Sequence, residues 1–92
     1  MIVRILGEGQ LKIDDASSGE LNTLDAAVEK AVNEGDEQAF RPALVALLDR
    51  VRTLGTPLPA DSLEPSDSIL PRADADLHEV RSMLSGEGYI PG

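Results

Sequence analysis

Apolar side chains recur every three or four residues through the middle of the chain, which is the spacing of one helix face. Residues 37–54 carry this stripe most densely, and residues 20–34 carry a second one. Between them, Gly35 favours the left-handed conformation that ends a helix, and Asp36 is a good N-cap for the next. The pattern predicts two antiparallel helices, with the helical hairpin 21–54 as the core. The stripe residues are Leu21, Leu24, Val28, Ala31, Val32, Phe40, Leu44, Leu47, Leu48, Val51 and Leu54.

Three residues in these helices stand apart from the stripe. Asp25 is expected on the polar side of the first helix. Val45 is apolar but lies outside the stripe of the second helix, so we expect it to face another element or a partner. Pro42 lacks a backbone N–H in the second turn and is expected to kink the helix or to delay its start.

The N-terminal residues 1–14 have the alternation of a β-hairpin. Ile2, Val3 and Ile5 favour a strand, and a second alternating run ends at Ile13. Gly7-Glu8-Gly9 supplies the turn between them. This turn lacks the third glycine and the following helix of a phosphate-binding loop.

Residues 55–73 differ in composition, because prolines at 57, 59, 65 and 71 interrupt them. This spacing predicts an irregular segment in which Ser68–Leu70 is long enough for a short edge strand. Leu58, Leu63, Ile69 and Leu70 are expected to hold it against the body of the molecule.

A third helix is predicted over 75–85, with Asp74 as its N-cap and an apolar stripe at Leu77, Val80 and Leu84. The predicted fold class is α+β: a small N-terminal β-hairpin packed with three helices. The length of 92 residues suits a single domain spanning 1–92.

The chain is acidic, with 17 acidic against 8 basic residues and a formal net charge of −9. This charge disfavours direct binding to nucleic acid and to anionic membranes. Cysteine is absent, which excludes disulfides and thiolate chemistry and suits the cytoplasm. We expect no signal peptide, and no apolar run reaches the length that spans a bilayer.

Candidate catalytic groups are few. His78 is the only histidine and is expected to be a solvated helix residue. The acidic clusters at 14–15, 61–67 and 74–76 lack the ligand spacing of a calcium loop, and Ser66 and Ser85 have no base other than His78. The sequence therefore predicts no catalytic, cofactor-binding or metal-binding residue, and no enzyme.

Four segments together resemble the PspA-associated protein family, PspAA. They are Met1–Gln10, Gly35–Phe40, Pro57–Asp67 and Leu84–Gly92. The resemblance implies a cytoplasmic accessory protein of a bacterial envelope-stress (phage-shock-type) response, membrane-associated only through its partner. That partner would be a PspA-like coiled-coil protein. Neither the residues nor the resemblance defines an oligomeric state.

Two functional hypotheses follow. The first is a non-catalytic adaptor whose exposed apolar residues bind the partner, with Val45, Tyr89 and Ile90 as the candidate contacts. The second is a small transcriptional or DNA-associated regulator, because the third helix and the Gly-led tail have the outline of a winged helix. A recognition helix needs basic or amide side chains, and this one offers only Arg81 and His78.

Overall fold

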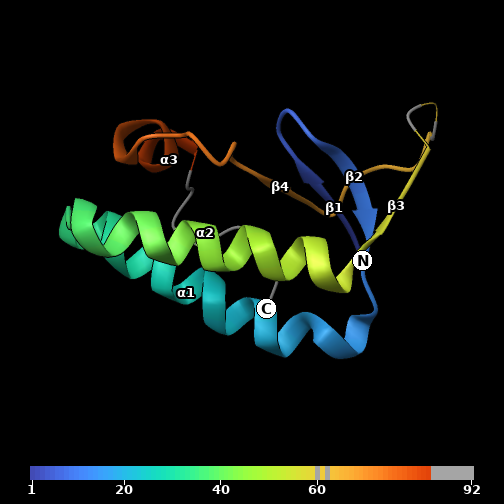
Figure 1. Cartoon of the computed structure of the whole chain (residues 1–92), viewed down its shortest axis with the longest axis horizontal. Helices are drawn as coiled ribbons and strands as arrows, with labels where there is room; N and C mark the ends of the chain where they lie inside the picture. Colours follow the sequence, from blue (N-terminus) through green and yellow to red (C-terminus); the bar gives the residue numbers. More distant parts are fainter. Residues whose placement is uncertain (60, 62, 84–92) are drawn as a thin grey trace.

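A four-stranded sheet forms one layer of the molecule, in the order β3-β2-β1-β4 (Figure 1). The computed structural model describes residues 1–59, 61 and 63–83. β1 (Ile2–Ile5) and β2 (Gly9–Lys12) are the predicted antiparallel hairpin, and β3 (Thr56–Pro57) pairs antiparallel with β2. β4 (Ser68–Leu70) lies parallel to β1 on its other side. The hairpin is thus extended at both edges by strands from much later in the chain.

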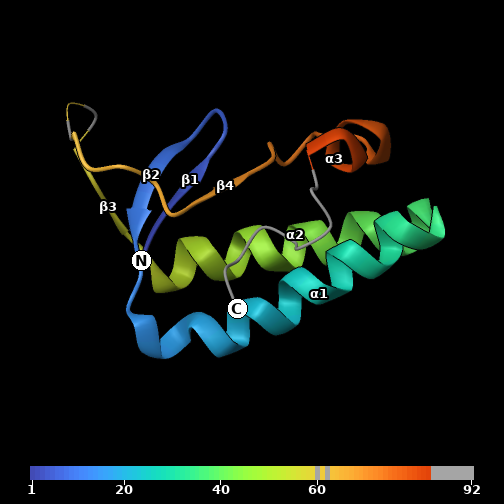
Figure 2. The ribbon, with the colours of Figure 1, turned by 180° about the vertical axis from the view of Figure 1, so that it is seen from behind.

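Two long helices form the second layer and lie side by side below the sheet (Figure 2). After a short 3-10 turn, η1 (Asp15–Ser17), the chain forms α1 (Ser18–Glu34) and then α2 (Glu37–Leu54). Gly35 has φ 67° and ends α1 as predicted. Asp36 accepts a hydrogen bond from the Ala39 N–H over 3.1 Å and caps α2, also as predicted. In the part of the chain that the structure describes, no helix is long and apolar enough to cross a membrane.

The hydrophobic core lies between these two layers and confirms the α+β prediction. Val3 and Ile5 of β1 and Leu70 of β4 point toward the helices and are fully buried. Burial of apolar side chains at about 25 cal/mol per Å² is the main force that holds the sheet on the helices. The core residues are Val3, Ile5, Ile13, Leu21, Val28, Ala31, Val32, Phe40, Leu44, Leu47, Leu48, Val51, Leu70, Ala75, Leu77 and Val80.

The expectation about Asp25 is wrong, and of the two effects expected of Pro42 the delayed start is not found. Asp25 is only 4% exposed, because it lies one turn after Leu21 and on the same face. α2 begins at Glu37 without delay, although it contains Pro42. The proline removes only a bond to an early carbonyl of the helix, and the Asp36 cap and the buried Phe40 hold the first turn in place.

Ser68–Leu70 forms the short edge strand β4, as predicted, and Thr56–Pro57 adds the strand β3, which was not predicted. Leu70 is buried in the core, but Ile69 is 48% exposed and Leu63 is 98% exposed. The expectation that Ile69 and Leu63 pin the segment is therefore wrong. Ile69 points away from the helices because neighbouring residues of a strand face opposite sides of the sheet.

The third helix, α3 (Leu77–Met83), begins two residues later than predicted. Asp76, not Asp74, caps it by accepting a hydrogen bond from the Glu79 N–H over 2.8 Å. Asp74 instead forms an exposed ion pair with Arg72. The helix starts late because Ala75 is buried in the core and follows a turn. The predicted end of the helix, 84–85, lies outside the described residues.

Candidate functional site

The tip of the β1–β2 hairpin is fixed to the end of α2 by charged hydrogen bonds. Arg52 Nε donates to Glu8 Oε1 over 2.8 Å, and Arg52 Nη2 donates to Glu8 Oε2 over 2.5 Å. A third bond joins Arg52 Nη1 to Asp49 over 2.7 Å. Hydrogen bonding to Arg52 lowers the pKa of the Glu8 carboxyl below its ordinary value. The pair is therefore ionised at neutral pH and holds the hairpin tip in place.

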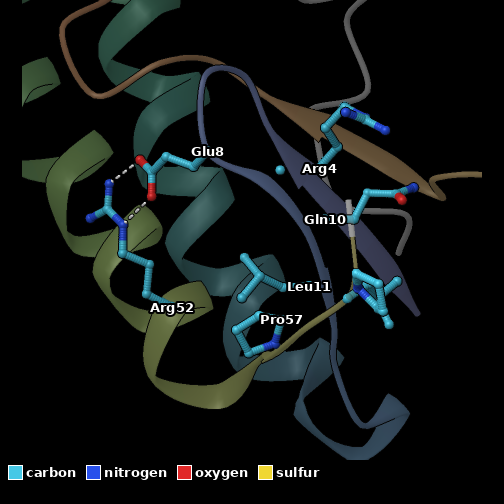
Figure 3. A pocket seen from close by; sticks show the side chains of 9 residues that line it. Arg4, Glu8, Gln10, Leu11, Arg52 and Pro57 are labelled. Carbon is cyan, nitrogen blue, oxygen red and sulfur yellow. Dashed lines mark hydrogen bonds and ion pairs between the residues drawn. The ribbon is translucent and has the colours of Figure 1, made fainter. Parts of the chain in front are cut away.

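A groove of about 460 Å³ opens beside this pair, where β3 leaves β2. Figure 3 shows Arg52 turned toward Glu8, and Leu11 beside Pro57 further along the groove. Glu8 is a poor general base because its charge is already satisfied by Arg52, and the lining contains no hydroxyl, thiol or imidazole. The groove therefore presents a paired charge beside apolar side chains. Its lining residues are Arg4, Glu8, Gly9, Gln10, Leu11, Arg52, Pro57, Leu58 and Pro59.

Gln10 holds the connection between β3 and β4 against the sheet. We call the described residues of this connection, 58, 59, 61 and 63–67, the crossover segment. Gln10 Nε2 donates to the Glu64 carbonyl and to Ser66 Oγ, both over 2.8 Å. β3 and β4 are at opposite edges of the sheet, and the Glu64 and Ser66 groups that Gln10 binds lie over β2. Gln10 projects away from the core, so the segment passes over the side of the sheet that faces away from the helices.

The sheet has a second face, away from the helices, that is open in part. We define the outer sheet face as Ile2, Arg4, Leu6, Lys12 and Ile69. Alternation with the buried Val3 and Ile5 places the first three of these on this face, and Ile69 lies beside Arg4 in the β1–β4 register. Lys12 is opposite Ile2 in β2. The crossover segment covers the β2 side over Gln10 and leaves Arg4, Leu6 and Ile69 exposed.

Sequence reasoning missed both Gln10 and the outer sheet face. The partners of Gln10 are 54 and 56 residues away in the chain, and a single amide in a strand does not indicate them. The exposure of Ile69 depends on which side of the sheet the strand presents. Only the alternation of Ile2, Arg4 and Leu6 with buried residues could have suggested the face.

The predicted contact residues are separated. Val45 is 40% exposed on α2, in agreement with its place outside the apolar stripe. Tyr89 and Ile90 lie outside the described residues, so their expected role is still a prediction. Val45 does not belong to the outer sheet face, which is built from the strands.

The candidate catalytic and metal-binding groups are not brought together. His78 is exposed on α3, and the Ser66 hydroxyl accepts the hydrogen bond from Gln10. Among the described residues, no group of three or more His, Cys, Asp or Glu side chains could hold a metal ion. The expected absence of a catalytic, cofactor or metal site stays a prediction.

The described part of α3 gives little support to the DNA-binding alternative. Arg81 Nη2 donates to the Val32 carbonyl over 2.7 Å, so this guanidinium is used to hold α3 on α1. The other charged side chain within Leu77–Met83 is the acidic Glu79. The tail that completes the winged-helix outline lies outside the described residues.

Comparison with known proteins identifies the family. The family model described as PspA-Associated protein, PspAA, matches residues 1–92. The chain belongs to the PspAA family. No curated protein and no solved structure gives a significant match. The family name describes accessory proteins and not enzymes. The name implies association with PspA.

Proposed function

We propose that this PspAA protein is a non-catalytic adaptor that binds a PspA-like coiled-coil protein in a bacterial envelope-stress response of the phage-shock type. The observation that carries the proposal is the family match over the whole chain. The adaptor works in the cytoplasm and reaches the membrane only through its partner. It neither binds nucleic acid nor inserts into the bilayer itself.

The structure supports binding over catalysis. The groove beside Glu8 and Arg52 has its two charges paired with each other, and exposed apolar residues lie elsewhere on the surface. Exposed apolar side chains that converge on one surface are typical of protein-binding sites. Val45, Tyr89 and Ile90 are the contacts that we propose from the sequence.

Co-purification with the PspA-like protein of the same organism tests the proposal. We expect the wild-type chain to form a stable complex, and Val45→Asp, Tyr89→Asp and Ile90→Asp to weaken it, since each places a charge in an apolar contact. The same variants should impair the envelope-stress response in cells. Wild-type chain that neither binds the PspA-like protein nor affects that response would contradict the proposed function.

A further inference from the structure

We infer that the outer sheet face binds the partner, and that it takes an amphipathic helix whose apolar ridge is flanked by carboxylates. The inference rests on the proposed function, because the helix belongs to the PspA-like protein. It goes further by naming the surface on this chain and the chemistry of the segment that fits it.

Exposed apolar side chains are concentrated on this side of the molecule. Among the described residues, the large hydrophobic side chains that are exposed are Leu6, Val45, Leu63 and Ile69. Leu6 and Ile69 are on the outer sheet face, and Leu63 precedes the Glu64 carbonyl that Gln10 binds on the same side. An apolar partner surface on this face would remove Leu6 and Ile69 from water.

The two charged residues of the outer sheet face are basic, whereas exposed carboxylates of Glu64 and Asp67 lie on the neighbouring crossover segment. Arg41, Arg50, Arg52, Arg72 and Arg81 each donate to a carbonyl or a carboxylate of the chain. Arg4 and Lys12 make no such bond within the described part of the molecule, and both project from the outer sheet face. A carboxylate of the partner would form an ion pair with either of them, whereas a basic stretch of the partner would be repelled.

The dimensions of the face suit a helix. Along β1, side chains on one face are about 6.7 Å apart, so Ile2 to Leu6 spans about 13 Å. A ridge of helix residues at i, i+4 and i+7 rises about 10 Å. One such ridge can therefore lie over Ile2, Arg4 and Leu6, with Ile69 beside it.

Other occupants suit this face less well. A second copy of the chain stacked on the same face would bring Arg4 and Lys12 close to their own equivalents. An anionic bilayer would attract these two residues, but the net charge of −9 opposes adsorption of the whole molecule.

The test measures the affinity of purified variants for the purified PspA-like protein of the same organism, by calorimetry. Ile69→Asp should weaken binding at least about tenfold, because it places a carboxylate in the apolar contact. Arg4→Glu should weaken it about three- to tenfold through like-charge repulsion.

Each variant has a matched control on α1. Lys30→Glu makes the same charge reversal as Arg4→Glu, and Ala26→Asp adds the same carboxylate as Ile69→Asp; both positions are exposed. The controls should bind within about twofold of wild type. Circular dichroism melts identify any variant that does not fold, and Arg4→Glu, at an exposed site, keeps the test decisive if Ile69→Asp fails to fold.

The outcomes separate the two proposals. Weaker binding by Ile69→Asp and Arg4→Glu, with unchanged controls, supports the inference. If both variants bind as tightly as wild type, the inference is overturned and the proposed function is unaffected. Absence of wild-type binding overturns both. Arg4→Glu is also tested for self-association by light scattering and for binding to phosphatidylglycerol vesicles. If the variant loses either of these but binds the PspA-like protein as wild type does, the inference is overturned.

Discussion

The contacts that define the helical layer differ in kind from those that define the sheet layer. Local signals define the helical layer: α1 and α2 follow each other through Gly35 and Asp36, and the apolar stripes face one another. The sheet joins segments that are far apart, since β1 pairs with β4 and Ile2 N–H donates to Asp67 Oδ2 across 65 residues. The helical hairpin thus depends on contacts between neighbours in the chain, while the exposed surface that we propose for binding depends on a few long-range bonds.

The largest effect is expected in the helical layer. Leu44→Ala removes a fully buried side chain of α2 and should lower the free energy of unfolding by about 2–5 kcal/mol, measured by urea denaturation. Val45→Ala, at the exposed neighbouring position, should change it by less than about 0.5 kcal/mol. If the two variants lowered the free energy of unfolding equally, α2 would not bury the face that carries Leu44.

The next effect is expected in the sheet layer. Gln10→Leu removes the donor that binds the Glu64 carbonyl and Ser66 Oγ, and should cost about 1–2 kcal/mol. Hydrogen exchange should quicken at the Leu58 and Asp67 amides, which bond to β2 and β1, and stay slow in α1 and α2. Gln38→Leu on the exposed side of α2 is the matched control. Exchange that quickens equally everywhere would contradict a local role for Gln10.

A smaller effect is expected at the link between the helices. Asp36→Ala removes the cap that accepts the Ala39 N–H and should lower stability by about 1 kcal/mol. Asp36→Ser keeps an acceptor at the same position, so it should lose only a few tenths of a kcal/mol. Thermal melts compare the three proteins. A serine variant as unstable as the alanine variant would show that the carboxylate acts through something other than capping.

The smallest effect is expected at the ion pair between Glu8 and Arg52, which joins the two layers, and this effect depends on pH. Because Arg52 lowers the pKa of Glu8, the pair stabilises the fold above the unfolded-state pKa of Glu8 and stops doing so as the pH falls through the lower, folded-state pKa. The pair is more than one-third exposed, so Glu8→Gln should cost only about 0.2–1 kcal/mol at neutral pH. Urea midpoints should converge with wild type in acid. A difference that persists there would exclude the ion pair as its cause.

Several features of the fold could be predicted without the structure. The helix stripes, the Gly35 stop, the Asp36 cap and the Gly-rich hairpin turn all depend on neighbours within a few residues, and each is found as predicted. The start of α3 was misjudged because Asp74 and Asp76 are both suitable caps. The burial of Ala75 decides between them, and that burial depends on the rest of the core.

The exposed apolar residues were only partly predictable. Val45, which lies outside the outer sheet face, is predicted to be exposed because it breaks a regular stripe. Ile69 and Leu63 were expected to be buried because they are apolar, which is a weaker guide in a segment without periodicity. Leu70 is buried and Ile69 is exposed because β4 places neighbouring residues on opposite sides of the sheet.

The sequence by itself determined the helical hairpin and the β1–β2 hairpin, because their turns, caps and apolar spacing act between residues close in the chain. Only the tertiary structure decided that Ser68–Leu70 pairs with β1, that Gln10 holds the crossover segment, and that Arg4 and Ile69 are neighbours on an open face. Such pairings bring distant segments together at a cost in chain entropy. Burial of the core offsets that cost, and the pairings cannot be inferred from any short stretch of the sequence.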